Sequence, residues 1–121
     1  MIRQGDVFWY DFGVPRESEP GYRRPAIVIQ NDIANRSAIK TTMVCAVTTN
    51  VRLARAPGNI LLDADEANLP RRSVVNVSQV VTINKSDLAD DAFIGTLSQM
   101  RVAAIIAGVT TFLRPSSSRS P

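Results

Sequence analysis

The sequence predicts a small, mainly β protein of the α+β class, in which a strongly curved antiparallel sheet or barrel is capped by a C-terminal α-helix. Short runs of branched and aromatic residues, separated by turn-forming residues, fill the chain up to about residue 83. After Gly95 the apolar residues recur at intervals of three and four, the period of an amphipathic helix. The length of 121 residues and the hydrophobic fraction of 45% suit one domain with one core.

The expected strands are short and lie close together in the chain. They span residues 7–12, 25–29, 41–48, 59–62, 73–77 and 79–83, the last two forming one long stretch bent near Ser78. Residues 13–22 form a loop that is long for a compact domain, and such loops often carry function. Asn31 can start a short helical turn over residues 31–35, and residues 52–59 form a second loop.

The predicted helix has two competing start signals. Thr96-Leu97-Ser98-Gln99 fits a capping box with Thr96 as the N-cap, and Ser98 is a rival N-cap. Pro115 ends the helix. We therefore expect one domain over residues 1–113, followed by a disordered Ser/Pro-rich tail over residues 114–121.

Composition excludes several kinds of chemistry. The chain has no histidine, which rules out Ser-His-Asp and Cys-His catalysis and argues against a zinc site. Its one cysteine, Cys45, stands in an apolar run and is expected to be a buried small residue. We expect no metal and no cofactor. The sequence has no apolar run long enough for a transmembrane helix and no signal-peptide core at its start, so a cytoplasmic protein with no membrane partner is expected.

The charge is distributed unevenly along the chain, although the net charge is only +3. Residues 16–55 carry seven basic and three acidic side chains, whereas residues 60–91 carry three basic and six acidic ones. A basic half suits phosphate binding. An ordinary solvated surface would also account for it, and charge alone does not separate the two interpretations.

The best candidate for a functional site is the segment 16–25 that leads into a buried strand. Arg24 comes just before this strand and is therefore held by a rigid element, and its fork of N–H donors matches phosphate geometry. Thr48 closes another strand, at an edge where loops gather. On its own, Thr48 is better explained by the preference of threonine for strands than by a functional role.

Several segments of the chain, in order over about residues 2–113, resemble the MazF/PemK family of toxins. The similar segments are IRQGDVFWYD (2–11), ESEPG (17–21), RPAIVIQNDIANR (24–36), CAVTTN (45–50) and SVVNVSQVVTINK (73–85). The resemblance implies a small SH3-like barrel with a C-terminal helix that forms a homodimer, with an RNA groove across the dimer. It implies metal-independent cleavage of single-stranded RNA at short sequences, leaving a 2′,3′-cyclic phosphate and a 5′-hydroxyl. It also implies a cognate antitoxin whose C-terminal segment fills the RNA groove.

The resemblance also assigns roles to residues. The catalytic arginine of the family falls on Arg24, the catalytic threonine on Thr48 and the loop acid on Glu19. The expected RNA contacts are Ser18, Tyr22, Arg23, Asn31, Thr49, Asn50, Arg52, Arg55 and Gln79. Among them, Arg23, Arg52 and Arg55 are expected on backbone phosphates, and Tyr22 is a candidate for stacking on a base. For Trp9, core packing is favoured over stacking.

The sequence departs from the family pattern at a few positions. Pro20 stands where the family has glutamine, Glu17 where it has glycine, and Ser78 and Val81 where many members have an acid and an arginine. These differences bear on base preference.

The hypothesised mechanism is attack of the RNA's own 2′-hydroxyl on the adjacent phosphorus. Arg24 would neutralise charge developing in the transition state, and Thr48 would donate a hydrogen bond to a phosphate oxygen. Glu19 could accept the proton or hold Arg24 in place, and the sequence does not decide between them.

Two rival functions share the predicted architecture. One is a gyrase-binding toxin of the CcdB type without nuclease activity, and the other is a non-catalytic barrel that binds RNA or a protein tail. The presence of Arg24, Thr48 and Glu19 favours the nuclease over both.

Overall fold

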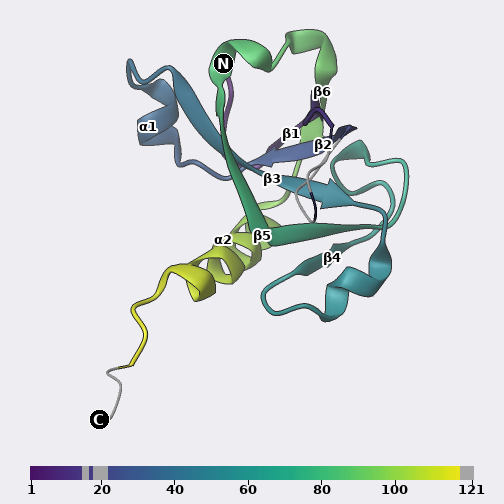
Figure 1. The fold of residues 1–121 in the computed structure, drawn as a ribbon. Coiled ribbons are helices and arrows are strands. Elements are labelled where there is room, and N and C mark those ends of the chain that lie inside the picture. The colour runs from purple at the N-terminus through teal and green to yellow at the C-terminus, as the bar shows by residue number, and fades with distance from the viewer. Residues whose placement is uncertain (15–16, 18–21, 118–121) are drawn as a thin grey trace.

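The computed structural model describes residues 1–14, 17 and 22–117, and it contains one six-stranded antiparallel sheet. The strands are β1 (Asp6–Asp11), β2 (Arg23–Val28), β3 (Thr41–Thr48), β4 (Ile60–Leu62), β5 (Ser73–Asn84) and β6 (Phe93–Thr96). Their order in the sheet is β4-β5-β3-β2-β1-β6 (Figure 1). Helix α2 (Gln99–Leu113) packs against β5 and β4, so the predicted mainly β barrel with a C-terminal helix is confirmed.

Shorter helical elements connect the strands. These are α1 (Asp32–Arg36) and the 3₁₀ turns η1 (Val51–Arg55), η2 (Glu66–Asn68), η3 (Lys85–Asp87) and η4 (Asp90–Ala92). The predicted turn after Asn31 is α1, and the Asn31 side chain caps it by accepting a hydrogen bond from the Ala34 N–H at 3.0 Å. Within the described residues, no helix is long and apolar enough to cross a membrane.

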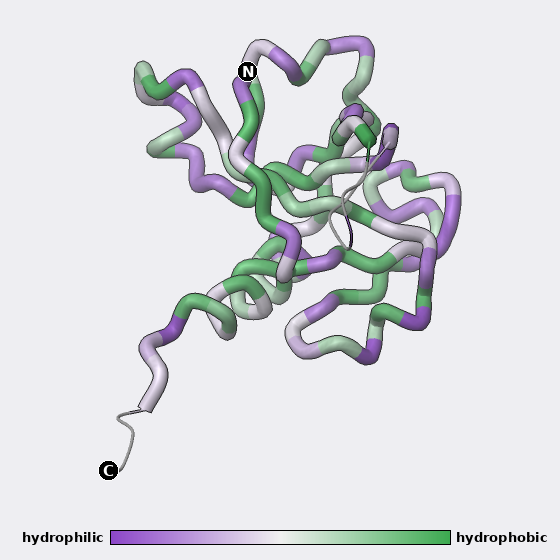
Figure 2. Tube along the Cα trace, viewed as in Figure 1, coloured by the Kyte–Doolittle hydropathy of each residue, from purple (hydrophilic) through white to green (hydrophobic). Residues whose placement is uncertain are grey.

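Side chains alternate between the two faces of the sheet along each strand, and both faces carry apolar side chains. On β1, Val7 belongs to the larger core, which includes Ile105 and Val109 of α2, whereas Phe8 belongs to a smaller core on the opposite face. Apolar segments therefore run through the central strands and α2, while polar segments mark the connecting loops (Figure 2). Cys45 is fully buried in the larger core, as expected, and burial raises the pKa of its thiol to about 12.

The long strand β5 is interrupted where the sequence predicted a bend. Val80 lies opposite Cys45 of β3, but Val75 lies opposite Val47, so residues 76–79 leave the ladder at Ala46. Such an irregularity increases local twist and bends the sheet. The sheet therefore curls, and η2 bridges its two edges because the Asn68 amide donates to the Ile94 carbonyl of β6 at 3.0 Å.

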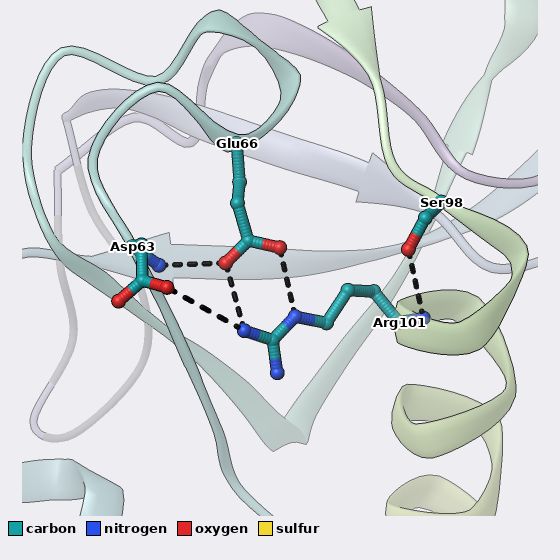
Figure 3. Close-up of polar contacts among 4 residues, drawn as sticks. All are labelled: Asp63, Glu66, Ser98 and Arg101. Carbon is teal, nitrogen blue, oxygen red and sulfur yellow. Dashed lines mark hydrogen bonds and ion pairs between the residues drawn. The ribbon is translucent and has the colours of Figure 1, made fainter.

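A bidentate ion pair ties the loop after β4 to the start of α2. Arg101 donates from Nε to Glu66 Oε1 at 2.8 Å and from Nη2 to Glu66 Oε2 at 2.9 Å (Figure 3). Glu66 Oε2 also accepts the Asp63 N–H at 2.7 Å, and the Asp63 carboxylate lies 3.9 Å from Arg101 Nη2. This arrangement, which we call the Glu66–Arg101 clamp, fixes η2 against the helix.

The start of the last helix differs from one of the two expectations. Ser98 is the N-cap, with its side-chain oxygen accepting the Arg101 N–H, so the capping box on Thr96 was wrong. Thr96 instead ends β6, a strand that the sequence did not predict, and its hydroxyl donates to Asp6 Oδ1 at 2.8 Å. The helix ends at Leu113 and residues 115–117 follow without regular structure. The rest of the predicted tail, residues 118–121, lies outside the described residues.

Candidate active site

The two central candidates meet where β2 begins and β3 ends. Ala26 of β2 lies opposite Ala46 of β3, and Arg24 and Thr48 each lie two residues beyond this pair on their own strands. Arg24 Nη1 donates to Thr48 Oγ1 at 3.4 Å, a long hydrogen bond, and both side chains are half-buried. The structure therefore brings the predicted arginine and threonine together on adjacent strands of one sheet.

The hydroxyl of Thr48 is oriented by its neighbours. Its oxygen accepts hydrogen bonds from Arg24 Nη1 and from the Asn50 N–H, the latter at 3.1 Å. A hydroxyl has two acceptor positions and one proton, so both acceptor positions are used. Among the described residues no acceptor takes the Thr48 proton, which leaves that O–H able to donate to a ligand oxygen.

A pocket of about 200 Å³ surrounds this pair. It is lined by Trp9, Tyr22, Arg23, Arg24, Pro25, Val47, Thr48, Thr49, Pro70 and Ser73. The described lining residues include two arginines and no acid, so the pocket is suited to an anion. A phosphate held here can contact the Arg24 guanidinium and the Thr48 hydroxyl at the same time.

Four other predicted site residues, Tyr22, Arg23, Thr49 and Asn50, lie in or beside this pocket, and Arg23 is one of its lining residues. Tyr22 is 64% exposed, and its backbone oxygen accepts the Phe12 N–H at 2.9 Å where the first loop returns to the sheet. Thr49 lines the pocket directly. Asn50 caps η1 by accepting the Arg52 N–H, while its own N–H binds Thr48.

The remaining candidates are not brought into the pocket. Arg52 and Arg55 are exposed on η1, the 3₁₀ turn that begins three residues after Thr48, and they do not line the pocket. Gln79 is half-buried in the interruption of β5. Asn31 follows the far end of β2 and is used as the cap of α1, so the structure separates it from Arg24 and Thr48. Ser18 and Glu19 lie outside the described residues.

The structure corrects the expectation for Trp9 and adds two residues, Pro70 and Ser73, that the sequence did not single out. Trp9 was expected in the core, but it is half-buried, belongs to neither core cluster and lines the pocket. Its ring carries the Arg23 guanidinium at 5.6 Å from the ring centroid, a cation–π contact. Pro70, in the loop before β5, and Ser73, the first residue of β5, also line the pocket, and the pairing of β5 with β3 brings them there.

Other surface features among the described residues offer weaker candidates for a catalytic site than the Arg24–Thr48 pair. A larger pocket of about 1060 Å³ lies along α2 and the N-terminal segment, and its lining is mostly apolar and hydroxyl side chains of one helix face. Within the described part of the chain, no three His, Cys, Asp or Glu side chains gather in a group that could hold a metal ion. The Arg24–Thr48 pair is thus the best-defined candidate for chemistry.

A curled antiparallel sheet with a C-terminal helix packed against it matches a known class of protein. The family model described as PemK-like, MazF-like toxin of type II toxin-antitoxin systems matches residues 3–113, and the chain belongs to this family. Among its relatives, it is 46% identical over 90 residues to the endoribonuclease MazF6 of Mycobacterium tuberculosis, which covers 74% of this chain and 79% of the relative. It is 38% identical over 90 residues to the endoribonuclease EndoA of Bacillus subtilis, covering 74% and 77% of the two chains.

Solved structures agree with the fold. The structure of an endoribonuclease in complex with its cognate antitoxin, from a mycobacterial species, superposes with a TM-score of 0.74 at 19% identity and covers 93% of this chain and 95% of that one. A crystal structure of MazF from Deinococcus radiodurans also gives 0.74, at 21% identity and with 93% and 96% coverage. At these identities the likeness supports the architecture alone.

Proposed function

We propose that this endoribonuclease toxin cleaves single-stranded RNA without a metal ion, by attack of the RNA's own 2′-hydroxyl on the adjacent phosphorus. The products are a 2′,3′-cyclic phosphate and a 5′-hydroxyl. The observation that carries the proposal is the Arg24–Thr48 pair, with the two side chains 3.4 Å apart in a pocket whose described lining has no acid. Its relatives named as endoribonucleases, at 33–46% identity, support the reaction class.

Arg24 stabilises charge in this mechanism. An arginine stays protonated at neutral pH, so its planar fork binds the phosphate and offsets the negative charge that builds up on the equatorial oxygens. The strand β2 holds it in place before the substrate arrives, which lowers the reorganisation needed during the reaction. Removing one such donor typically costs on the order of 10²–10³ in rate.

Thr48 supplies a hydrogen bond in the same step. Its oxygen is held by Arg24 and the Asn50 N–H, so its proton can point to a non-bridging phosphate oxygen. In this mechanism Glu19 either accepts the proton from the 2′-hydroxyl or orients Arg24. Ser18, Tyr22, Arg23, Asn31, Thr49, Asn50, Arg52, Arg55 and Gln79 remain proposed RNA contacts.

The proposed biological setting is a type II toxin–antitoxin pair in the cytoplasm. A solved relative is bound to its cognate antitoxin, which supports an antitoxin partner for this chain. We also propose a homodimer. Large apolar side chains at both ends of α2, Met100, Phe112 and Leu113, are 82%, 51% and 74% exposed, which suits burial against another protein surface.

The test is cleavage of a long mixed-sequence RNA by the purified protein in EDTA, with the new ends mapped. Wild type is expected to make discrete cuts with 5′-hydroxyl ends, and Arg24→Ala is expected to make none. Arg36→Ala is the matched control, because Arg36 is an exposed arginine at the end of α1, which follows the end of β2 remote from Arg24, and it does not line the pocket. Cleavage by Arg24→Ala at the wild-type rate would contradict the proposal.

Three further comparisons separate the roles. Arg24→Lys keeps the charge but loses the fork, so near-normal turnover would exclude the geometric role of Arg24. Thr48→Ser should be milder than Thr48→Val, and equal losses would mean that Thr48 only packs. A substrate with 2′-deoxyribose at the cut position should resist cleavage, and its cleavage would refute attack by the 2′-hydroxyl. Absence of cutting by a folded wild type would favour gyrase binding or a non-catalytic module.

A further inference from the structure

Arg23 has a geometry that phosphate binding does not explain. It lies opposite Asp11 in the β1–β2 register, yet among the described residues it makes no ion pair with that carboxylate. Asp11 Oδ1 instead accepts the Gly13 N–H at 2.8 Å. The Arg23 guanidinium lies over the ring of Trp9. The flat cation is thus placed by an aromatic ring rather than by its acidic neighbour.

Trp9 and Arg23 separate two adjoining pockets. Both residues line the pocket of about 200 Å³ that holds Arg24 and Thr48. Both also line a second pocket of about 480 Å³, whose other walls are Tyr10, Asp11, Asp87, Ala89, Asp91 and Ala92. If an RNA phosphate binds at Arg24, the sugar or base next to that phosphate would therefore lie against Trp9 and Arg23.

The charges around the second pocket indicate which part of the nucleotide that is. Its wall carries the carboxylates of Asp11, Asp87 and Asp91, which repel a phosphate. A nucleobase is neutral and has a flat face, and unpaired bases in RNA complexes stack on aromatic rings and on guanidinium planes. The anionic backbone is favoured at Arg24, and a base is favoured at the Trp9–Arg23 pair.

We propose that the Arg23 guanidinium, which lies over the ring of Trp9, is a stacking platform for an unpaired base next to the cleaved phosphate. Trp9 and Arg23 thereby determine how tightly that nucleotide is held and in which register the strand crosses Arg24. The proposal rests on the proposed function, because it takes RNA as the ligand. It assigns Arg23 to a base rather than to a backbone phosphate.

The chain offers a direct probe, because Trp9 is its only tryptophan. The ligand is a short oligonucleotide containing the mapped cleavage sequence, with 2′-deoxyribose at the cut position so that it binds without reacting. Its binding should change the Trp9 fluorescence, and a version with one abasic nucleotide beside the cut should bind with a much smaller change. Inorganic phosphate should leave the fluorescence unchanged. An equal change with the abasic strand would overturn the proposal.

Affinity measurements by anisotropy of a labelled strand then test Arg23. Loss of one stacked base should weaken binding to wild type by about five- to 150-fold. Arg23→Lys keeps the positive charge but removes the planar guanidinium, so this variant should bind the intact strand more weakly than wild type by a similar factor. Its affinity for the abasic strand should be little lower than its affinity for the intact strand. Trp9→Phe should have a smaller effect in the same direction, because tryptophan gives the stronger cation–π contact.

The controls distinguish failure of the stacking proposal from failure of the proposed function. Arg36→Lys makes the same change at an exposed arginine away from both pockets and should bind like wild type. If Arg23→Lys binds like wild type, or if the abasic loss is the same in both proteins, Arg23 contacts only phosphate and the inference is wrong. Lack of cleavage of the ordinary RNA by wild type would instead refute the proposed function. Because Arg23 is exposed, thermal melting should show an intact fold in its variants.

Discussion

Replacing Glu66 by glutamine tests how far the Glu66–Arg101 clamp stabilises the fold. The substitution keeps the shape of the side chain but removes its charge and turns an N–H₂ group towards the Arg101 donors or the Asp63 N–H. Three hydrogen bonds of 2.7–2.9 Å end on the Glu66 carboxylate, two from the guanidinium and one from the Asp63 amide. Glutamine has one acceptor oxygen and can keep only part of this set.

The expected loss follows from the strength and exposure of these bonds. Hydrogen bonds to charged groups contribute about 1.5–3 kcal/mol when they are well shielded, and exposed ion pairs contribute about 0.2–1 kcal/mol. The side chains of Glu66 and Arg101 are 25% and 33% exposed, between these cases. We therefore expect Glu66→Gln to lower the free energy of unfolding by about 1–2 kcal/mol, which for a domain of this size lowers the Tm by roughly 3–10 °C.

The pH dependence gives an independent check. Hydrogen bonds from Arg101 hold the pKa of the Glu66 carboxyl below its ordinary value of 4.5. A carboxyl whose pKa is lowered by folding stabilises the protein above its unfolded pKa, and that stability is lost as the pH falls through the folded pKa. The difference in unfolding free energy between wild type and Glu66→Gln should therefore be constant from pH 6 to 8 and shrink below about pH 4.5.

Urea unfolding followed by circular dichroism at pH 7 and pH 3.5 measures this difference. Glu17→Gln is the control, because Glu17 is an exposed glutamate on the first loop that takes no part in the clamp. Equal stability of wild type and Glu66→Gln at pH 7 would refute the assigned strength. A difference that stays the same at pH 3.5 would refute its electrostatic origin.

Three further predictions concern the fold. Gly108→Ala should lower the free energy of unfolding by about 1–3 kcal/mol, since a Cβ there would lie 2.3 Å from the Gly58 carbonyl oxygen. The control is Ala103→Gly, at an exposed position of the same helix, which should lower it by only about 1 kcal/mol. The same urea titrations measure both variants. Asn35→Ala should cost about 2–4 kcal/mol by the same measurement, because its buried amide makes four hydrogen bonds to neighbouring groups, and a loss below 0.5 kcal/mol would contradict this role. Cys45 should not react with a thiol reagent at pH 8 in the folded protein and should react in urea, because burial raises its thiol pKa to about 12, and fast labelling of the native protein would show that the core opens.

The sequence predicted the elements whose residues carry a strong local pattern. The apolar run at Ile27 and Val28 and the branched residues of β5 prefer strands and bury one face, so their positions could be inferred without a partner. The three- and four-residue spacing of Ile105, Gly108 and Val109 likewise marks α2. For these segments local preference and tertiary burial agree.

The elements that were missed depend on distant contacts. β6 has four residues, one of them Gly95, and it pairs only with β1. A Cβ at Gly95 would lie 2.5 Å from the Ala67 carbonyl oxygen, so this glycine lets β6 lie against η2, which is remote in the sequence. Thr96 has the side chain of a helix cap, but Asp6 takes its hydroxyl, and the cap moves to Ser98.

The site was predictable to the extent that it depends on strand ends. Arg24 lies near the start of β2 and Thr48 lies at the end of β3, and the antiparallel pairing of these two strands brings the two side chains together. The position of Trp9 could not be predicted, because a tryptophan in a strand can face the core or the surface. Only the pairing of β1 with β2, in which Trp9 lies opposite Pro25, puts its side chain at the pocket. Asn31 was included because it lies in the similar segment, but its side chain is used to cap α1.

The order of the chain sets when the proposed active site acquires its supporting core. Arg24 and Thr48 precede Leu97, Ile105 and Val109 in the chain, and these later residues belong to the core beneath the strands of Arg24 and Thr48. β1 also stays unpaired on one side until β6 has emerged. A nascent chain that has not yet reached these residues therefore holds Arg24 and Thr48 without the packed core beneath their strands.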